Sequence, residues 1–83
     1  MERLRNKKRF RNDKFLKAFG AHLKSVRKSV GKSQEDLAGE ANTSLSQVGR
    51  IERGERAPTI LTLYLFAKTL GVHPKRLLDF DHK

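Results

Sequence analysis

The side chains that most often carry catalysis or bind metals are scarce in this sequence. Cysteine is absent, which excludes disulfides, thiolate metal sites and a thiol nucleophile. The three histidines are scattered, and there is neither a glycine-rich phosphate loop nor a nucleophile with a neighbouring base. We therefore expect a protein that binds a partner rather than an enzyme, with no metal ion and no cofactor.

Positive charge is the dominant chemical feature of the chain. Nineteen Lys and Arg residues stand against nine Asp and Glu residues, giving a net charge of +10. This exceeds the charge of about 2–8 that keeps a small domain soluble, so it predicts a polyanionic partner. Nucleic acid is the first candidate, and an anionic membrane surface is the second. A membrane-spanning segment is not expected, because no apolar run approaches the roughly 20 residues that span a bilayer.

The charge divides the chain into two parts. Residues 1–14 hold seven cations and two acids, or +5, and the remaining 69 residues carry the other +5. Segments with such dense charge are commonly disordered when free. We therefore expect a basic, disordered arm over residues 1–14 and one folded domain over residues 15–83. The arm has only three apolar residues and no continuous amphipathic face, which argues against a membrane-surface peptide.

The elements that must position binding residues follow from apolar spacing and helix-capping residues. The first helix is predicted by apolar residues at steps of three and four, namely Leu16, Phe19, Leu23, Val26 and Val30. Gly31 follows as a natural C-terminal stop. Gly20, inside this helix, is expected to weaken it somewhat.

Two short helices joined by a tight turn are predicted next. The capping-box sequence SQED (33–36), imperfect because its last residue is Asp, begins a helix that ends before Asn42. Asn42 is the non-glycine residue best suited to a left-handed turn. A second capping box, SLSQ (44–47), begins a helix closed by Gly54. Residues 33–53 therefore make a helix-turn-helix arrangement.

Two further helices complete the prediction. Thr59 begins a helix that ends before Gly71, and its core face is expected to be formed by Ile60, Leu63, Ala67 and Leu70. A last short helix has Pro74 in its first turn and Leu77 pointing inward. No stretch alternates like a strand, so the predicted fold class is all-α with five helices.

Residues 33–72 resemble the Cro/phage-repressor (XRE) family of helix-turn-helix proteins. The resemblance is carried by SQEDLA (33–38), the turn NTS (42–44), VGRIERGERAPT (48–59) and LFAKTLGV (65–72). With the flanking helices it covers residues 16–80 and leaves out the basic arm. The resemblance implies a five-helix domain of the lambda-repressor-like type that binds double-stranded DNA.

The resemblance also implies which residues contact base edges. In the family the second helix of the motif lies in the major groove, so the corresponding residues here are Leu45, Ser46, Gly49 and Arg50. Arg50 can donate two hydrogen bonds to guanine, and Ser46 can bond several bases. Leu45 departs from the polar residue often found there; it contacts a thymine methyl or simply faces solvent. Gly49 loosens the helix but lets the backbone approach DNA. The alternative for Arg50 is a solvated surface residue.

Phosphate contacts and one internal ion pair are implied in the same way. Gln34 matches a family position that contacts phosphate at a helix N-terminus, the alternative being a plain helix cap. Arg53 and Arg56 flank the end of the base-contacting helix and are expected on the DNA backbone. Arg27 and Glu52 resemble the family's internal Arg–Glu pair; the alternative is two unpaired surface charges.

A homodimer is predicted from the outer face of the helix over residues 59–70. Leu61 and Leu65 fall nearly opposite the expected core face and stack at i and i+4. Leu78 and Phe80 extend this apolar stripe. In the alternative, the chain's own arm or tail covers these leucines in a monomer.

These features favour a cytoplasmic, sequence-specific transcriptional regulator, a repressor or autoregulator that binds a palindromic operator as a dimer. Two alternatives use the same fold. One is an antitoxin that binds a toxin partner and its own promoter, and the other is the controller protein of a restriction–modification system. Neighbouring genes would distinguish them.

Overall fold

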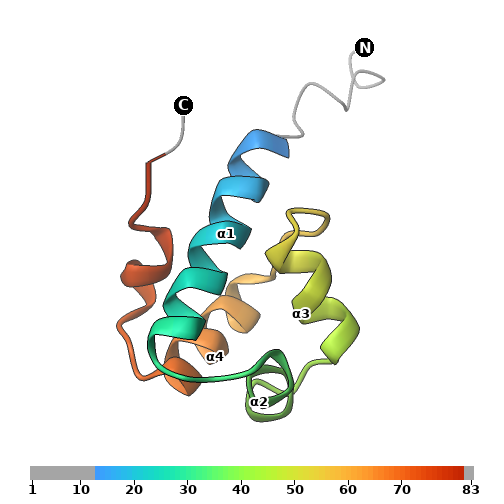
Figure 1. Cartoon of the computed structure of the whole chain (residues 1–83), viewed down its shortest axis with the longest axis vertical. Coiled ribbons are helices and arrows are strands. Elements are labelled where there is room, and N and C mark those ends of the chain that lie inside the picture. Colours follow the sequence, from blue (N-terminus) through green and yellow to red (C-terminus); the bar gives the residue numbers. More distant parts are fainter. Residues whose placement is uncertain (1–12, 82–83) are drawn as a thin grey trace.

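The computed structural model describes residues 13–81, and its elements follow the predicted order. Within that range they are α1 (Asp13–Ser29), α2 (Gln34–Glu40), α3 (Leu45–Glu52), α4 (Ile60–Leu70) and the short 3-10 helix η2 (Pro74–Leu78) (Figure 1). The same residues contain no strand, which confirms the all-α prediction. The arm predicted over residues 1–14 lies outside the described residues except for its last two. Those two belong to α1, and the division of the chain after residue 14 stays a prediction.

Helix starts follow the capping residues in the sequence. At α2 the box is complete despite the short aspartate, because the Asp36 amide donates to Ser33 Oγ and the Ser33 amide donates to Asp36 Oδ2, each at 3.0 Å. The backbone hydrogen bond from Ser33 is the main reason that the pKa of the Asp36 carboxyl lies below its usual value. At α3 only half of the predicted box forms, the bond from the Gln47 amide to Ser44 Oγ at 3.1 Å.

Helix ends also follow the sequence. Each α-helix is followed by a residue with positive φ, namely Gly31, Asn42, Gly54 and Gly71. Beyond each of these residues the next amide bonds back to a carbonyl of the last helical turn. At the end of α2 the Thr43 amide donates to the Ala38 carbonyl at 2.9 Å. The left-handed conformation of Asn42 is what makes the turn between α2 and α3 tight.

One apolar core joins the five elements. Its buried side chains are Phe19, Leu23, Val26, Leu37, Ala38, Ala41, Val48, Ile51, Leu63, Phe66, Ala67, Leu70 and Leu77. Ile60 was predicted on the core face of its helix but is 80% exposed at the first turn of α4. Val30, the last apolar residue in the spacing of the first helix, is exposed because α1 ends at Ser29. Phe66 is fully buried instead, so the inner face of α4 is the side that carries Phe66 rather than Ile60.

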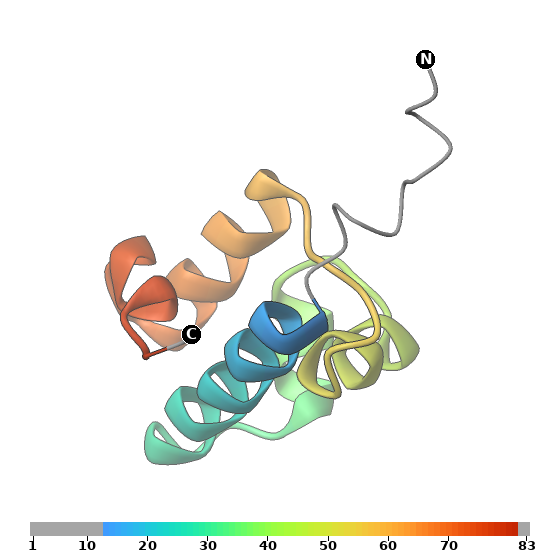
Figure 2. The same cartoon turned by 90° about the horizontal axis from the view of Figure 1, so that it is seen from above.

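Helix α1 lies between α3 on one side and η2 on the other (Figure 2). Gly20 marks where α1 crosses α3. A Cβ at this position would overlap the backbone carbonyl oxygens of Ile51 and Glu52. Gly54 makes a second close approach, since a Cβ there would come within 2.7 Å of the Lys17 Cα. The two glycines therefore let α1 and the end of α3 pack backbone against backbone.

Candidate nucleic-acid interface

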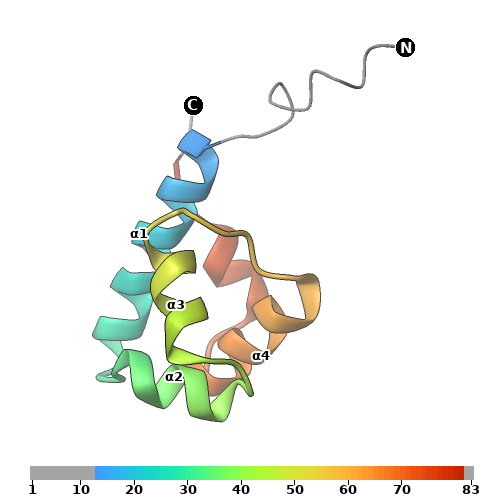
Figure 3. The same ribbon diagram turned by 90° about the vertical axis from the view of Figure 1, so that its right-hand side faces the viewer.

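Helix α3 presents one polar face to solvent and buries the other. Figure 3 looks onto α3, with α2 beneath it and α4 to its right. Val48 and Ile51 are buried in the core, whereas Leu45, Ser46 and Arg50 are exposed. The two polar side chains are four residues apart, so they project on the same side of the helix. This outward face offers hydrogen-bonding side chains, with a basic residue in the second turn of the helix.

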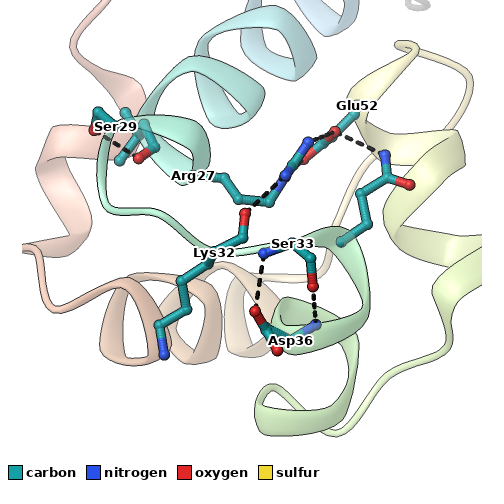
Figure 4. Close-up of polar contacts among 8 residues, drawn as sticks. Arg27, Ser29, Lys32, Ser33, Asp36 and Glu52 are labelled. Carbon is teal, nitrogen blue, oxygen red and sulfur yellow. Dashed lines mark hydrogen bonds and ion pairs between the residues drawn. The ribbon is translucent and has the colours of Figure 1, made fainter.

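A buried polar network holds α3 from behind. Arg27 Nε lies 2.7 Å from Glu52 Oε2, and Arg27 Nη2 donates to Glu52 Oε1 at 3.0 Å (Figure 4). Both residues are buried, so the structure contains the internal pair expected from the sequence rather than two surface charges. Arg27 Nη1 also donates to the Lys32 carbonyl at 2.8 Å, which ties the pair to the segment before α2. Bidentate, charge-assisted bonds fix orientation as well as distance.

Gln34 joins this network. Its side-chain amide donates to Glu52 Oε1 at 2.9 Å, and the cap of α2 is Ser33, so the alternative of Gln34 as a plain cap is wrong. Glu52 thus accepts bonds from α1 and from α2 at once. The first turn of α2 is positioned directly by the last residue of α3, and the two helices of the motif keep a fixed relative orientation.

The four expected base-contacting residues do not share one environment. Leu45, Ser46 and Arg50 are open to solvent, but Gly49 is buried beneath the Arg53 side chain. The position that a Cβ would take at Gly49 lies 3.1 Å from Arg53 Nη1. The gap left by the glycine is therefore filled by an arginine from the next turn.

Arg53 is itself paired. Its Nε donates to Glu55 Oε2 at 2.9 Å and its Nη2 donates to Glu55 Oε1 at 3.3 Å. These hydrogen bonds lower the pKa of the Glu55 carboxyl and raise that of the Arg53 guanidinium. Arg56 is exposed beside a shallow hollow between α3 and α4 that Gln47 and Thr62 also line.

The expected dimer face is only partly free. Leu61 is 62% exposed and Leu78 is half exposed, but Leu65 and Phe80 pack against the chain's own core. The Phe80 ring lies 5.4 Å from the Phe15 ring, centroid to centroid. Ile60 and Tyr64 of α4 are exposed instead. The exposed apolar stripe is therefore Ile60, Leu61, Tyr64 and Leu78, shifted from the predicted set.

Sequence reasoning missed the contacts that depend on tertiary approach. These are the crossing at Gly20, the Gln34–Glu52 bond and the Arg53–Glu55 pair. A glycine in the middle of an otherwise strong amphipathic helix is a sequence signal that could have indicated the close crossing at Gly20. The part of the chain that the structure describes contains no group of three potential metal ligands and no helix able to cross a membrane.

The two short helices at a fixed angle, with an exposed polar face on the second, define a helix-turn-helix protein. The helix-turn-helix family model HTH_3 matches residues 23–77. The chain is 40% identical over 63 residues to control protein C.BamHI of Bacillus amyloliquefaciens, covering 75% of this chain and 78% of that protein. The chain therefore belongs to the HTH_3, or XRE-type, helix-turn-helix family, as the motif resemblance implied.

Several solved structures share its fold, and two of them illustrate the similarity. One is the restriction-modification controller protein C.AhdI from Aeromonas hydrophila, with a TM-score of 0.73, 35% identity, and coverage of 75% of this chain and 94% of that chain. The other is the clp gene regulator ClgR from Corynebacterium glutamicum, with a TM-score of 0.74, 26% identity, and coverage of 77% and 68%. The names of these relatives describe a control protein, a restriction-modification controller and a gene regulator.

Proposed function

We propose that this protein is a cytoplasmic, sequence-specific transcriptional regulator that inserts α3 into the major groove of duplex DNA. The observation that carries the proposal is the exposed face of α3 held rigidly by the Arg27–Glu52 pair. Ser46 and Arg50 extend from this face, where they contact base edges. The Leu45 methyl groups contact thymine, and the backbone at Gly49 faces the groove beside them once the Arg53 side chain that covers it moves onto phosphate.

Phosphate contacts flank the inserted helix. The amides in the first turn of α2, at Gln34, meet one phosphate, because helix N-termini favour anions. Arg53 and Arg56, both exposed beyond the end of α3, meet the backbone on the other side. These contacts fix the register of α3 without reading sequence.

The regulator acts as a homodimer through the exposed apolar stripe of α4 and η2. Ile60, Leu61, Tyr64 and Leu78 lie on the surface of one chain, where a self-complementary contact would bury them. A two-fold dimer sets two copies of α3 about 34 Å apart, one turn of a palindromic operator. The matching test is sedimentation: wild type should be a dimer at micromolar concentration and Leu61→Glu a monomer. A monomeric wild type removes this interface.

Selection of bound duplexes from a random pool tests the function itself. Wild type should enrich a two-fold symmetric sequence, because two identical helices contact two half-sites. The control is the double variant Ser46→Ala with Arg50→Ala, whose changes lie on the exposed face of α3 and leave the core intact. Its enrichment should be weaker. A protein that binds DNA yet enriches no sequence, or does not bind DNA, contradicts the proposal.

A second, narrower candidate is a controller protein of a restriction–modification system. It is favoured by the similarity to C.BamHI and by the near-complete coverage of C.AhdI. The gene should then lie beside genes for a methyltransferase and an endonuclease, and the selected operator should occur upstream of them. A toxin gene in that position would favour an antitoxin instead.

A further inference from the structure

Arg53 occupies a gap in the exposed face of α3. Leu45, Gly49 and Arg53 are spaced four residues apart, so they form one row along the helix axis. Helical side chains lean toward the N-terminus and cover the preceding turn. Since Gly49 has no side chain, the Arg53 guanidinium lies over it, 3.1 Å from where a Cβ would be. The guanidinium is thereby drawn onto the surface proposed to meet DNA.

The backbone after α3 fixes the partner of Arg53. Gly54 has a φ of 79°, and its amide donates to the Ile51 carbonyl at 3.0 Å. The next amide, that of Glu55, reaches back to the Arg50 carbonyl at 2.9 Å. These two bonds form a Schellman motif, which reverses the chain immediately after the helix. The reversal brings the Glu55 carboxylate against the Arg53 guanidinium, where both oxygens accept hydrogen bonds.

This pair has the geometry of an arginine bound to a phosphate. A guanidinium grips carboxylate and phosphate oxygens with the same two-pronged fork. The pair is also open to solvent, with 60% of the Arg53 side chain and 54% of the Glu55 side chain exposed. Exposed ion pairs contribute little to stability and exchange partners readily. Holding the fold together is therefore a weak account of this contact.

We propose that Glu55 competes with DNA phosphate for the Arg53 guanidinium. In the free protein Glu55 holds Arg53 over Gly49, and a backbone phosphate displaces Glu55 when the protein binds DNA. The proposal rests on the DNA-binding function proposed above. Glu55 thus lowers the affinity of the protein for any duplex.

The test compares two variants that each remove one exposed acid. Glu55→Gln removes the competitor. The matched control is Glu40→Gln, since Glu40 is also the acid of a surface pair, with Lys32 at 3.1 Å, and its side chain is 53% exposed. Affinity for a fluorescent mixed-sequence duplex is measured by anisotropy at one salt concentration, because phosphate contacts need no operator. Glu55→Gln should bind about three- to fivefold tighter than wild type, and Glu40→Gln within about twofold of it.

The same comparison in an Arg53→Ala background separates competition from general charge. Without the guanidinium, the advantage of Glu55→Gln should fall to that of Glu40→Gln. The proposal is overturned if Glu55→Gln binds no tighter than Glu40→Gln in the wild-type background, or if its advantage survives undiminished without Arg53. A wild-type protein that binds no duplex would instead reject the DNA-binding function itself.

Discussion

The Glu52→Ala substitution should remove a large part of the stability of this fold. It deletes the acceptor of two Arg27 bonds, at 2.7 and 3.0 Å, and of the Gln34 bond at 2.9 Å. Among the described residues, the Arg27 guanidinium is then left buried with the Lys32 carbonyl as its remaining hydrogen-bond partner. Breaking one side of a buried pair costs about 3–5 kcal/mol. Since a small domain has about 5–15 kcal/mol in total, the variant should lose at least about a fifth of its free energy of unfolding, and most of it if the domain is marginally stable.

Urea denaturation followed by far-ultraviolet circular dichroism measures this loss. Glu40→Ala is a close control, because Glu40 is likewise the last residue of its helix and is ion-paired, but its side chain is exposed. The control should lose less than about 1 kcal/mol. If Glu52→Ala unfolds at the same urea concentration as Glu40→Ala, the buried network does not hold α3, and the argument for a rigid DNA-contacting face is refuted.

The remaining predictions concern packing, base preference and the arm. Gly20→Ala should lower the free energy of unfolding by about 1–3 kcal/mol or more, because its Cβ meets backbone atoms of α3. Gly39→Ala has open space around it, so it should leave the stability unchanged or raise it by up to about 1 kcal/mol. Equal melting temperatures of the two variants would contradict the close crossing of α1 and α3 at Gly20. Arg50→Ala should lose about 1–3 kcal/mol of binding at one base pair and relax preference there, with Ser46→Ala relaxing a different position; uniform weakening on all sequences would make Arg50 a phosphate contact. Deleting residues 1–12 should weaken specific and non-specific binding alike and flatten the salt dependence, by about 0.9 in log–log slope for each phosphate that the arm neutralises; an unchanged slope would remove the arm from the interface.

Helix boundaries were predictable because their signals are local. Capping side chains and the left-handed residues Asn42 and Gly54 act within a few residues of the turn they make, so the sequence reports them directly. The inner face of α4 was not predictable. Apolar residues occupy nearly every position from Ile60 to Ala67, so periodicity could not separate the exposed Ile60 from the buried Phe66.

The site shows the same division between local and tertiary information. The motif located the exposed positions Ser46 and Arg50, because a helix with one buried face determines its outward face. The hydrogen-bond partner of Gln34 could not be predicted from the sequence, because Glu52 is eighteen residues away and comes near only after α2 and α3 pack. For Gly20 the sequence shows that a glycine interrupts a strong amphipathic helix at an unfavourable helix propensity. Only the packed structure shows why a side chain there would be more unfavourable still.

In α3, the residues that hold the helix in place are separate from the residues proposed to contact bases. Its inner side is fixed by backbone contact at Gly20 and by the bonds that converge on Glu52. Neither support uses an atom of the exposed positions Ser46 or Arg50, so changes there leave the orientation of the helix intact. The base-contacting residues can therefore vary with little effect on stability. The supporting residues cannot, because a shift of α3 by a single ångström would misplace every hydrogen bond to the bases at once.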